Sequence, residues 1–170
     1  MIVRPERPGD EAAIAAVVLA AFTRPDGGEV VEVKLVDDLR AGEGWLPRLS
    51  LVADVDGAVI GHVVCSRAAV DGAPALGLGP LGVHPGWQRR GVGQAMMHTV
   101  LGAADALGEP LVVLLGNPRY YGRFGFVAAS TLGIVAPEPA WGDAFQARPL
   151  AAYDPGLRGQ FRYAAAFEGL

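Results

Sequence analysis

The chain has 170 residues, 51% of them hydrophobic, which fits one globular domain spanning residues 1–170. A formal net charge of -4 argues against the broad basic face that nucleic acids and anionic membranes require, so we expect neither as a partner. Its single cysteine excludes an internal disulfide and fits a cytoplasmic protein. The three histidines lack zinc-site spacing, so no metal cofactor is expected.

The first part of the chain predicts a short strand followed by two helices. Residues 2–4 predict a short first strand. Asp10 then opens a helix whose apolar stripe repeats at helical spacing as far as Phe22. A second stripe covers residues 31–39, and Gly42 ends it.

The middle of the chain predicts a sheet with one parallel connection. Residues 49–54 and 59–66 are apolar strands joined by an Asp-Gly turn, so we expect an antiparallel hairpin. Residues 75–83 are extended but rich in glycine, which favours a bulge or close approach of a ligand. A helix over 91–107 leads to a buried strand at 111–115, and this β-α-β order predicts that the last two strands are parallel.

The C-terminal part is rich in proline and glycine, and two further strands are expected within 144–150 and 160–167. Together the elements predict an α/β fold with a mixed central sheet of about six strands and helices on both faces. Exposed edge strands also favour a homodimer.

The segment from Gly82 to Ala95 has the composition of an anion-binding helix start. The first amides of a helix have no internal partners, and Gly91 and Gly93 let a phosphate approach the backbone. Arg89 and Arg90 add positive charge there. A glycine-softened helix start with solvated arginines is the alternative. A dinucleotide-binding motif would need a third glycine where Met96 stands, and a P-loop would need Gly-Lys-Ser/Thr.

Residues 2–127 resemble the GNAT superfamily of N-acetyltransferases, and the run from Gln88 to Gly93 matches its Gln/Arg-x-x-Gly-x-Gly/Ala motif. The resemblance implies that motif amides hold the diphosphate of acetyl-CoA. It also implies a bulged strand that splays from its parallel neighbour to admit the pantetheine arm. The residues it assigns to the cosubstrate are Leu81, Gly82, Val83, Gln88, Arg89, Arg90, Gly91, Val92, Gly93, Gln94, Ala95, Asn117 and Tyr121.

A second segment, residues 116–126, resembles the family's Asn … Tyr-x-x-x-Gly-Phe signature, in which Tyr121 takes the place of the tyrosine. The five-residue offset from Phe126 selects Tyr121 over Tyr120. The resemblance implies that Tyr121 protonates the departing CoA thiolate, and a thiol of pKa about 8.5 leaves best when a hydroxyl can protonate it. Pro118 and the shortened spacing depart from the family pattern around Asn117.

The acceptor side has weaker candidates. In this family the second helix borders the substrate cleft, so Glu29 or Glu32 can take the proton of an amine directly or through water. Glu32 is the residue we assign as base, although solvated glutamates are common on helix surfaces. His84 ends the glycine-rich strand and can relay a proton, but a histidine before proline more often caps a turn.

These features predict an acetyl-CoA-dependent N-acetyltransferase that works by direct transfer to the amine of a small molecule, protein or peptide. A strand amide near Val83 would hold the oxyanion of the tetrahedral intermediate. A non-catalytic acyl-CoA-binding or sensing module is the alternative. A scaffold protein without a ligand is the third reading, and acetyl-CoA would not stabilise it.

Overall fold

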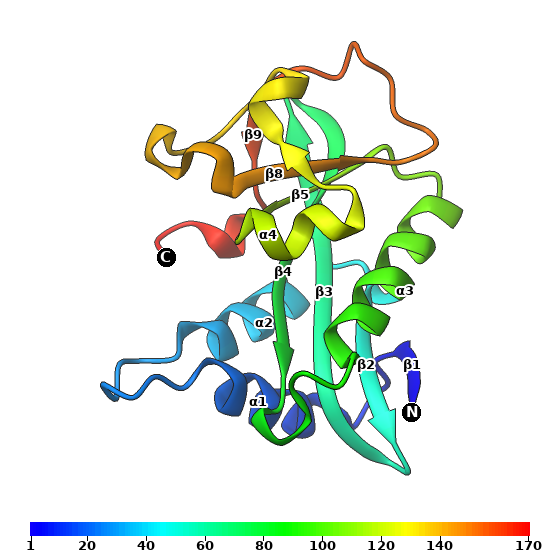
Figure 1. The fold of residues 1–170 in the computed structure, drawn as a ribbon, viewed down its shortest axis with the longest axis vertical. Helices are drawn as coiled ribbons and strands as arrows, with labels where there is room; N and C mark the ends of the chain where they lie inside the picture. Colours follow the sequence, from blue (N-terminus) through cyan, green and yellow to red (C-terminus); the bar gives the residue numbers. More distant parts are fainter.

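The computed structural model describes residues 1–170, and its elements follow the predicted chain order (Figure 1). The helices are α1 (Glu11–Phe22), α2 (Val31–Ala41), α3 (Val92–Ala106) and α4 (Pro118–Tyr121). The strands are β1 (Ile2–Pro5), β2 (Ser50–Val55), β3 (Ala58–Val70), β4 (Ala73–Val83), β5 (Leu111–Leu115), β6 (Val127–Ala128), β7 (Ile134–Val135), β8 (Phe145–Pro149) and β9 (Gly159–Arg162). Short 3-10 turns include η2 (Pro85–Trp87), η3 (Gly122–Phe124), η5 (Pro139–Ala144) and η6 (Ala165–Phe167).

The strands form one mixed sheet, which confirms the predicted α/β class. The main path runs β1-β2-β3-β4-β5-β8-β6, and β9 pairs with both β3 and β7. The β4–β5 and β7–β9 pairs are parallel, and the other pairs are antiparallel. The sheet has nine strands where about six were expected; seven correspond to predicted strands, and β6 and β7 are two-residue strands that the sequence pattern did not distinguish from loop.

Different helices cover the two faces of the sheet, as expected. Side chains alternate along a strand, so Leu51 and Val63 belong to the cluster under α3. Their neighbours Val52 and Val64 lie in clusters with α1 and α2 on the other face. No helix has both the length and the apolar character needed to cross a lipid bilayer.

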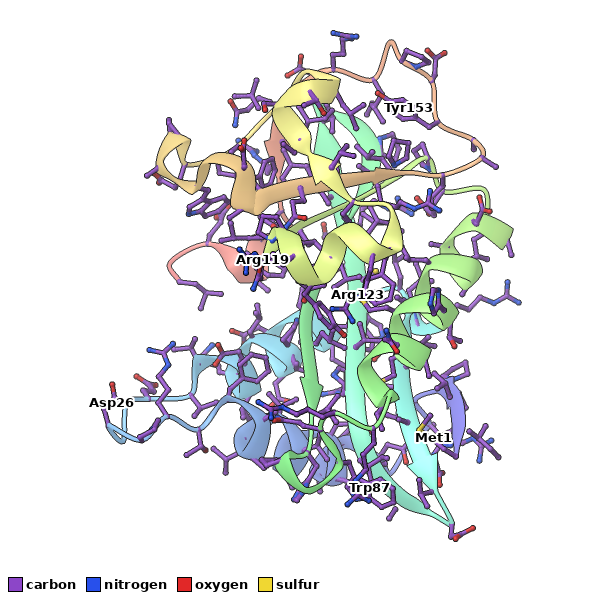
Figure 2. All side chains as sticks on the ribbon, viewed as in Figure 1. Met1, Asp26, Trp87, Arg119, Arg123 and Tyr153 are labelled. Carbon is purple, nitrogen blue, oxygen red and sulfur yellow. The ribbon has the colours of Figure 1, made fainter.

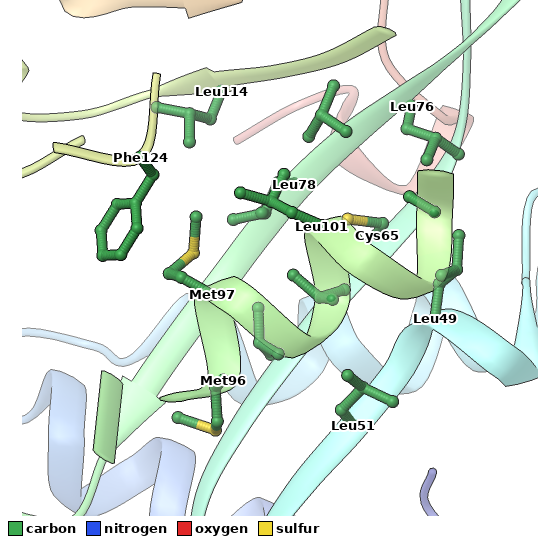
Figure 3. Packing of buried hydrophobic residues seen from close by; sticks show 14 of the residues in the cluster. Leu49, Leu51, Cys65, Leu76, Leu78, Met96, Met97, Leu101, Leu114 and Phe124 are labelled. Atoms are coloured by element: carbon green, nitrogen blue, oxygen red, sulfur yellow. The ribbon is translucent and has the colours of Figure 1, made fainter. Parts of the chain in front are cut away.

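Helix α3 supplies one side of the largest core cluster. Figure 3 shows Met96, Met97 and Leu101 of α3 over the strands, near Cys65 and Leu78. Cys65 is fully buried in β3, and burial raises the pKa of its thiol far above the usual range. The cysteine therefore packs in the core, and its buried thiol lacks the exposed, electropositive surroundings of a nucleophile.

The parallel pair β4–β5 separates soon after it forms. Only Leu76–Val112 and Gly77–Val113 are paired, although β4 continues to Val83. The register of β4 against β3 shifts between Val63 and Cys65, which places a bulge in the glycine-rich stretch as predicted. Figure 1 shows β5 and β8 crossing the direction of β3 and β4, so the second half of β4 is not paired with β5.

The C-terminal strands were predicted with mixed success. The strand within 144–150 is confirmed as β8. The strand expected over 160–167 is wrong beyond Arg162, because the chain leaves the sheet there and forms η6. Phe167 packs instead against the cluster of Leu35 and Leu39 on α2. At the opposite edge of the sheet, β1 exposes its first residues, and the homodimer expected from such edges stays a prediction.

Candidate active site

A cavity of about 550 Å³ opens where β4 ends and α3 begins, and we call it the turn cavity. Its walls come from the end of β4, the following turn, the first turn of α3 and the α4–η3 segment (Figure 1). It is lined by Leu81, Val83, Trp87, Gln88, Arg89, Gly91, Val92, Gly93, Gln94, Tyr120, Tyr121 and Arg123. Most residues predicted to bind the cosubstrate therefore gather around one hollow.

The backbone at the start of α3 is shaped to receive an anion. Gly91 is the N-cap, with φ of 80° and no side-chain cap, and the first intrahelical bond joins the Ala95 amide to the Gly91 carbonyl. The amides of residues 92–94 therefore lack helical partners. Arg89 also lies in the left-handed region, with φ of 60°, a conformation that costs a non-glycine residue energy and is concentrated at functional sites.

Close packing around the turn explains the second glycine of the motif. A Cβ at Gly93 would lie 2.8 Å from the Tyr120 hydroxyl, so a larger residue would displace that ring or fill the cavity. The Tyr120 ring in turn carries the Arg123 guanidinium 4.9 Å above its centre, a cation–π arrangement. Figure 2 shows Arg123 beside the segment that faces α3. Together with Arg89 it gives this acidic protein a local positive site.

The side chains of the turn mainly hold it in place. Gln88 Nε2 donates to the Val83 carbonyl at 3.1 Å and so ties the turn to the end of β4. His84 Nδ1 accepts from the Gly86 amide at 3.1 Å, which is the capping role weighed against a proton relay. Trp87, labelled in the turn in Figure 2, lies under the Arg90 guanidinium at 5.4 Å.

A second cavity, of about 440 Å³, lies in the splay between β4 and β5, and we call it the apolar cavity. Leu81 and Tyr121 line both cavities, so the two hollows meet at these residues. Glu32 of α2 is the charged side chain in the wall of the apolar cavity. Glu29 is exposed and contributes to neither cavity.

Tyr121 is fixed at this junction by tight packing. A Cβ at Gly116 would overlap the Tyr121 ring, so the absence of a side chain there makes room for it. Tyr120 and Phe126 contact the ring edge-on, with centroids at 4.9 Å and 5.9 Å. Burial, with a smaller contribution from Tyr120, raises the pKa of Tyr121 to about 12. The phenol therefore keeps its proton at neutral pH and is available as a donor.

Four residues assigned by resemblance lie outside both cavities. Gly82 faces α1, where a Cβ would meet Ala21 and Phe22. Arg90 stacks on Trp87 as described, and Ala95 lies beyond the lining part of α3. Asn117 Oδ1 accepts from the Arg119 amide at 2.9 Å and caps α4. No group of three or more His, Cys, Asp or Glu side chains is placed to hold a metal.

Sequence reasoning missed Tyr120 and Arg123 as parts of the turn cavity. Tyr120 was set aside because only Tyr121 fits the spacing of the signature, yet both rings line this cavity. Both missed residues belong to the same short segment as Tyr121. The signal available in the sequence was Arg123, a basic residue two positions after the tyrosine.

A buried polar cluster anchors the far end of α2. Arg40 Nε donates to Glu6 Oε1 at 2.8 Å, and Ser50 Oγ donates to Glu6 Oε2 at 2.5 Å. Ser50 Oγ also lies 2.9 Å from Nε2 of the buried His62. Burial alone raises the pKa of Glu6, but its contacts with His62, Arg40 and Ser50 outweigh burial and lower it to about 2. The cluster fixes the helix that carries Glu32.

Comparison with known proteins agrees with this geometry. The model of the acetyltransferase (GNAT) domain family matches residues 47–128. The N-acetyltransferase YhbS of Escherichia coli is 33% identical over 161 residues, which cover 94% of this chain and 92% of that protein. Its crystal structure in complex with CoA matches with a TM-score of 0.88, over 98% of this chain and 91% of that one.

A second solved structure extends the comparison to another organism. A GNAT family acetyltransferase from Brucella melitensis, in complex with acetyl-CoA, is 36% identical with a TM-score of 0.81. The match covers 98% of this chain and 97% of that chain. On the strength of both the sequence and the fold, the chain belongs to the GNAT superfamily of N-acetyltransferases.

Proposed function

We propose that the protein binds acetyl-CoA in the turn cavity, with the thioester end of its pantetheine arm entering the splay at Leu81 and Tyr121, and transfers its acetyl group directly to an amine held in the rest of the apolar cavity. The observation that carries the proposal is the meeting of the two cavities at Leu81 and Tyr121. The diphosphate binds the free amides of residues 92–94, with Arg89 and Arg123 adding positive charge. The two similar proteins solved with CoA and acetyl-CoA support this ligand.

The reaction follows from what the junction contains. The neutral amine attacks the thioester carbonyl carbon, forming a C–N bond and a tetrahedral oxyanion that a β4 amide near Val83 stabilises. Glu32 takes the amine proton directly or through water, since its side chain reaches the apolar cavity. The C–S bond then breaks, and the Tyr121 hydroxyl donates its proton to the leaving sulfur. Products are the acetylated amine and CoA.

We also propose that residues 1–170 form one catalytic unit that acts in the cytoplasm. Binding is tested by a thermal melt: at about 100 times its Kd, acetyl-CoA adds about 2.7 kcal/mol to the free energy of unfolding and raises Tm by several degrees. Catalysis is tested by release of the CoA thiol in the presence of a panel of amines. Stabilisation without thiol release for any amine would identify a non-catalytic binding module instead.

The role of Tyr121 is tested by Tyr121→Phe, which removes the hydroxyl and keeps the ring. We expect kcat to fall about a hundredfold, because general acid catalysis contributes that much or more, with the Kd for acetyl-CoA unchanged. Tyr153→Phe is the matched control, since Tyr153 lies far from both cavities on the loop after β8 (Figure 2). An unchanged kcat for Tyr121→Phe removes Tyr121 from the acid role.

A further inference from the structure

The apolar cavity has one charged side chain and many apolar ones. Eleven of the fourteen residues that line it are hydrophobic, and Glu32 is the exception with a charge. Its volume of about 440 Å³ falls within the range of small-molecule sites. A ligand that fills this space must therefore be mostly apolar and can place a single cation against Glu32.

Aromatic rings make up the wall that faces α2. Tyr163 and Phe167 stack with centroids 4.6 Å apart, and Trp141 meets Tyr163 edge-on at 6.4 Å. Burial raises the pKa of Tyr163, so this phenol stays neutral and the wall carries no negative charge. Flat apolar rings of this kind favour another flat ring packed beside them.

The charges around the two cavities differ in sign. Arg89 and Arg123 line the turn cavity, whereas no basic side chain lines the apolar cavity. Lys34, on the same helix as Glu32, is exposed and paired with Asp38 outside the cavity. The Glu32 carboxylate is therefore free to pair with an ammonium group that enters the apolar cavity.

We propose, on the basis of the transferase function above, that the acceptor is a primary amine on an aromatic body with no other charge, such as a phenethylamine or a tryptamine. The ring fills the space beside Trp141, Tyr163 and Phe167, and the ammonium group lies at Glu32. A polyamine or an aminoglycoside carries several cations, and one carboxylate leaves the others unpaired among apolar side chains at high cost.

The first experiment compares acceptors by release of the CoA thiol from acetyl-CoA. Phenethylamine should exceed butylamine, which lacks the ring, and spermidine, which adds charges, by at least about tenfold in kcat/KM, since small differences in apolar contact give such ratios. If spermidine or an aminoglycoside is the better substrate, the aromatic assignment is overturned and the transferase function stands. If no amine releases thiol although acetyl-CoA binds, the transferase function itself fails.

A second experiment places a cation in the apolar cavity without disturbing the core. Leu115 lines this cavity and is 44% exposed, and Leu107 at the end of α3 is 41% exposed and lines neither the turn cavity nor the apolar cavity. Leu115→Lys should raise the KM for phenethylamine about tenfold or more by repelling its ammonium group. The KM for acetyl-CoA should stay constant, and Leu107→Lys should change neither constant.

The same pair of variants tests whether the apolar cavity holds a long acyl chain instead. If an acyl chain fills the apolar cavity, the parent enzyme should prefer hexanoyl-CoA to acetyl-CoA. Leu115→Lys should then abolish this preference and leave the KM for phenethylamine unchanged. This combination of results would overturn the proposal. An effect confined to the aromatic amine supports it.

Discussion

The turn cavity and the apolar cavity meet at Tyr121 but are built in opposite ways. The turn cavity is made largely from one continuous segment, residues 81–94, and offers backbone amides and positive charge. The apolar cavity is assembled from side chains of distant segments, from Phe22 to Leu170, and offers rings and one carboxylate. A backbone-built site is specified by local sequence, whereas a site built from side chains depends on long-range packing.

The largest expected effect concerns the turn cavity, which is built mainly from backbone amides. Gly93→Asp places a carboxylate where the diphosphate should bind, and like charges in contact cost several kcal/mol, so acetyl-CoA affinity should fall more than about a hundredfold. The Tyr120 hydroxyl must move away from the new Cβ, but the fold should survive because an acidic residue in the first turn of a helix is favourable. Calorimetric titration measures the affinity. Gly102→Asp, on the same helix in open space, is the control.

Glu6→Gln tests the apolar cavity indirectly, by weakening the polar cluster that anchors α2. The pKa of Glu6 is about 2, below its usual value of 4.5, so its contribution is complete above about pH 4.5 and disappears as pH falls toward 2. The variant should lose about 2 kcal/mol at pH 7, typical of hydrogen bonds to a charged group, and its free energy of unfolding should depend less on pH between 2 and 4.5.

Denaturant unfolding over that pH range measures the difference. We also expect a higher KM for the amine and an unchanged Kd for acetyl-CoA, because α2 contributes to the apolar cavity alone. Glu29→Gln makes the same change in charge at an exposed position and should be neutral. Equal loss of affinity for both substrates would contradict the separation of the two cavities.

The smallest effect concerns the junction. Gly116→Ala puts a methyl group where the Tyr121 ring lies and should move the hydroxyl, lowering kcat about tenfold because reacting groups tolerate little misplacement. Gly122→Ala adds the same methyl group in open space six residues later and should have no effect. Steady-state kinetics distinguishes the two, and equal rates would show that ring position does not limit turnover.

The sequence predicted what depends on local patterns. The turn after β4, the start of α3 and the bulge in β4 are all encoded within residues 75–95, and the structure places them as expected. Tyr121 was found from a spacing signature, and it lies at the junction. The capping role of the Asn117 side chain was not predicted. Asparagine commonly serves both as a helix cap and as a ligand-binding residue, so the sequence does not separate the two roles.

The aromatic wall could not be predicted from sequence. Trp141 lies in η5, Tyr163 follows the end of β9 and Phe167 lies in η6, and they meet only because β9 pairs with β3 and the chain then turns toward α2. The alternation of residues 160–163 favours a strand, which is why its end was placed too late. Long-range pairing decides where such a strand stops.

The aromatic wall also has a consequence for how this protein can diversify. Its rings come from residues 141–167, whereas the turn cavity is complete by Arg123. Variation confined to the codons for residues 141–167 can therefore retune acceptor choice while the shared acyl donor chemistry is inherited unaltered.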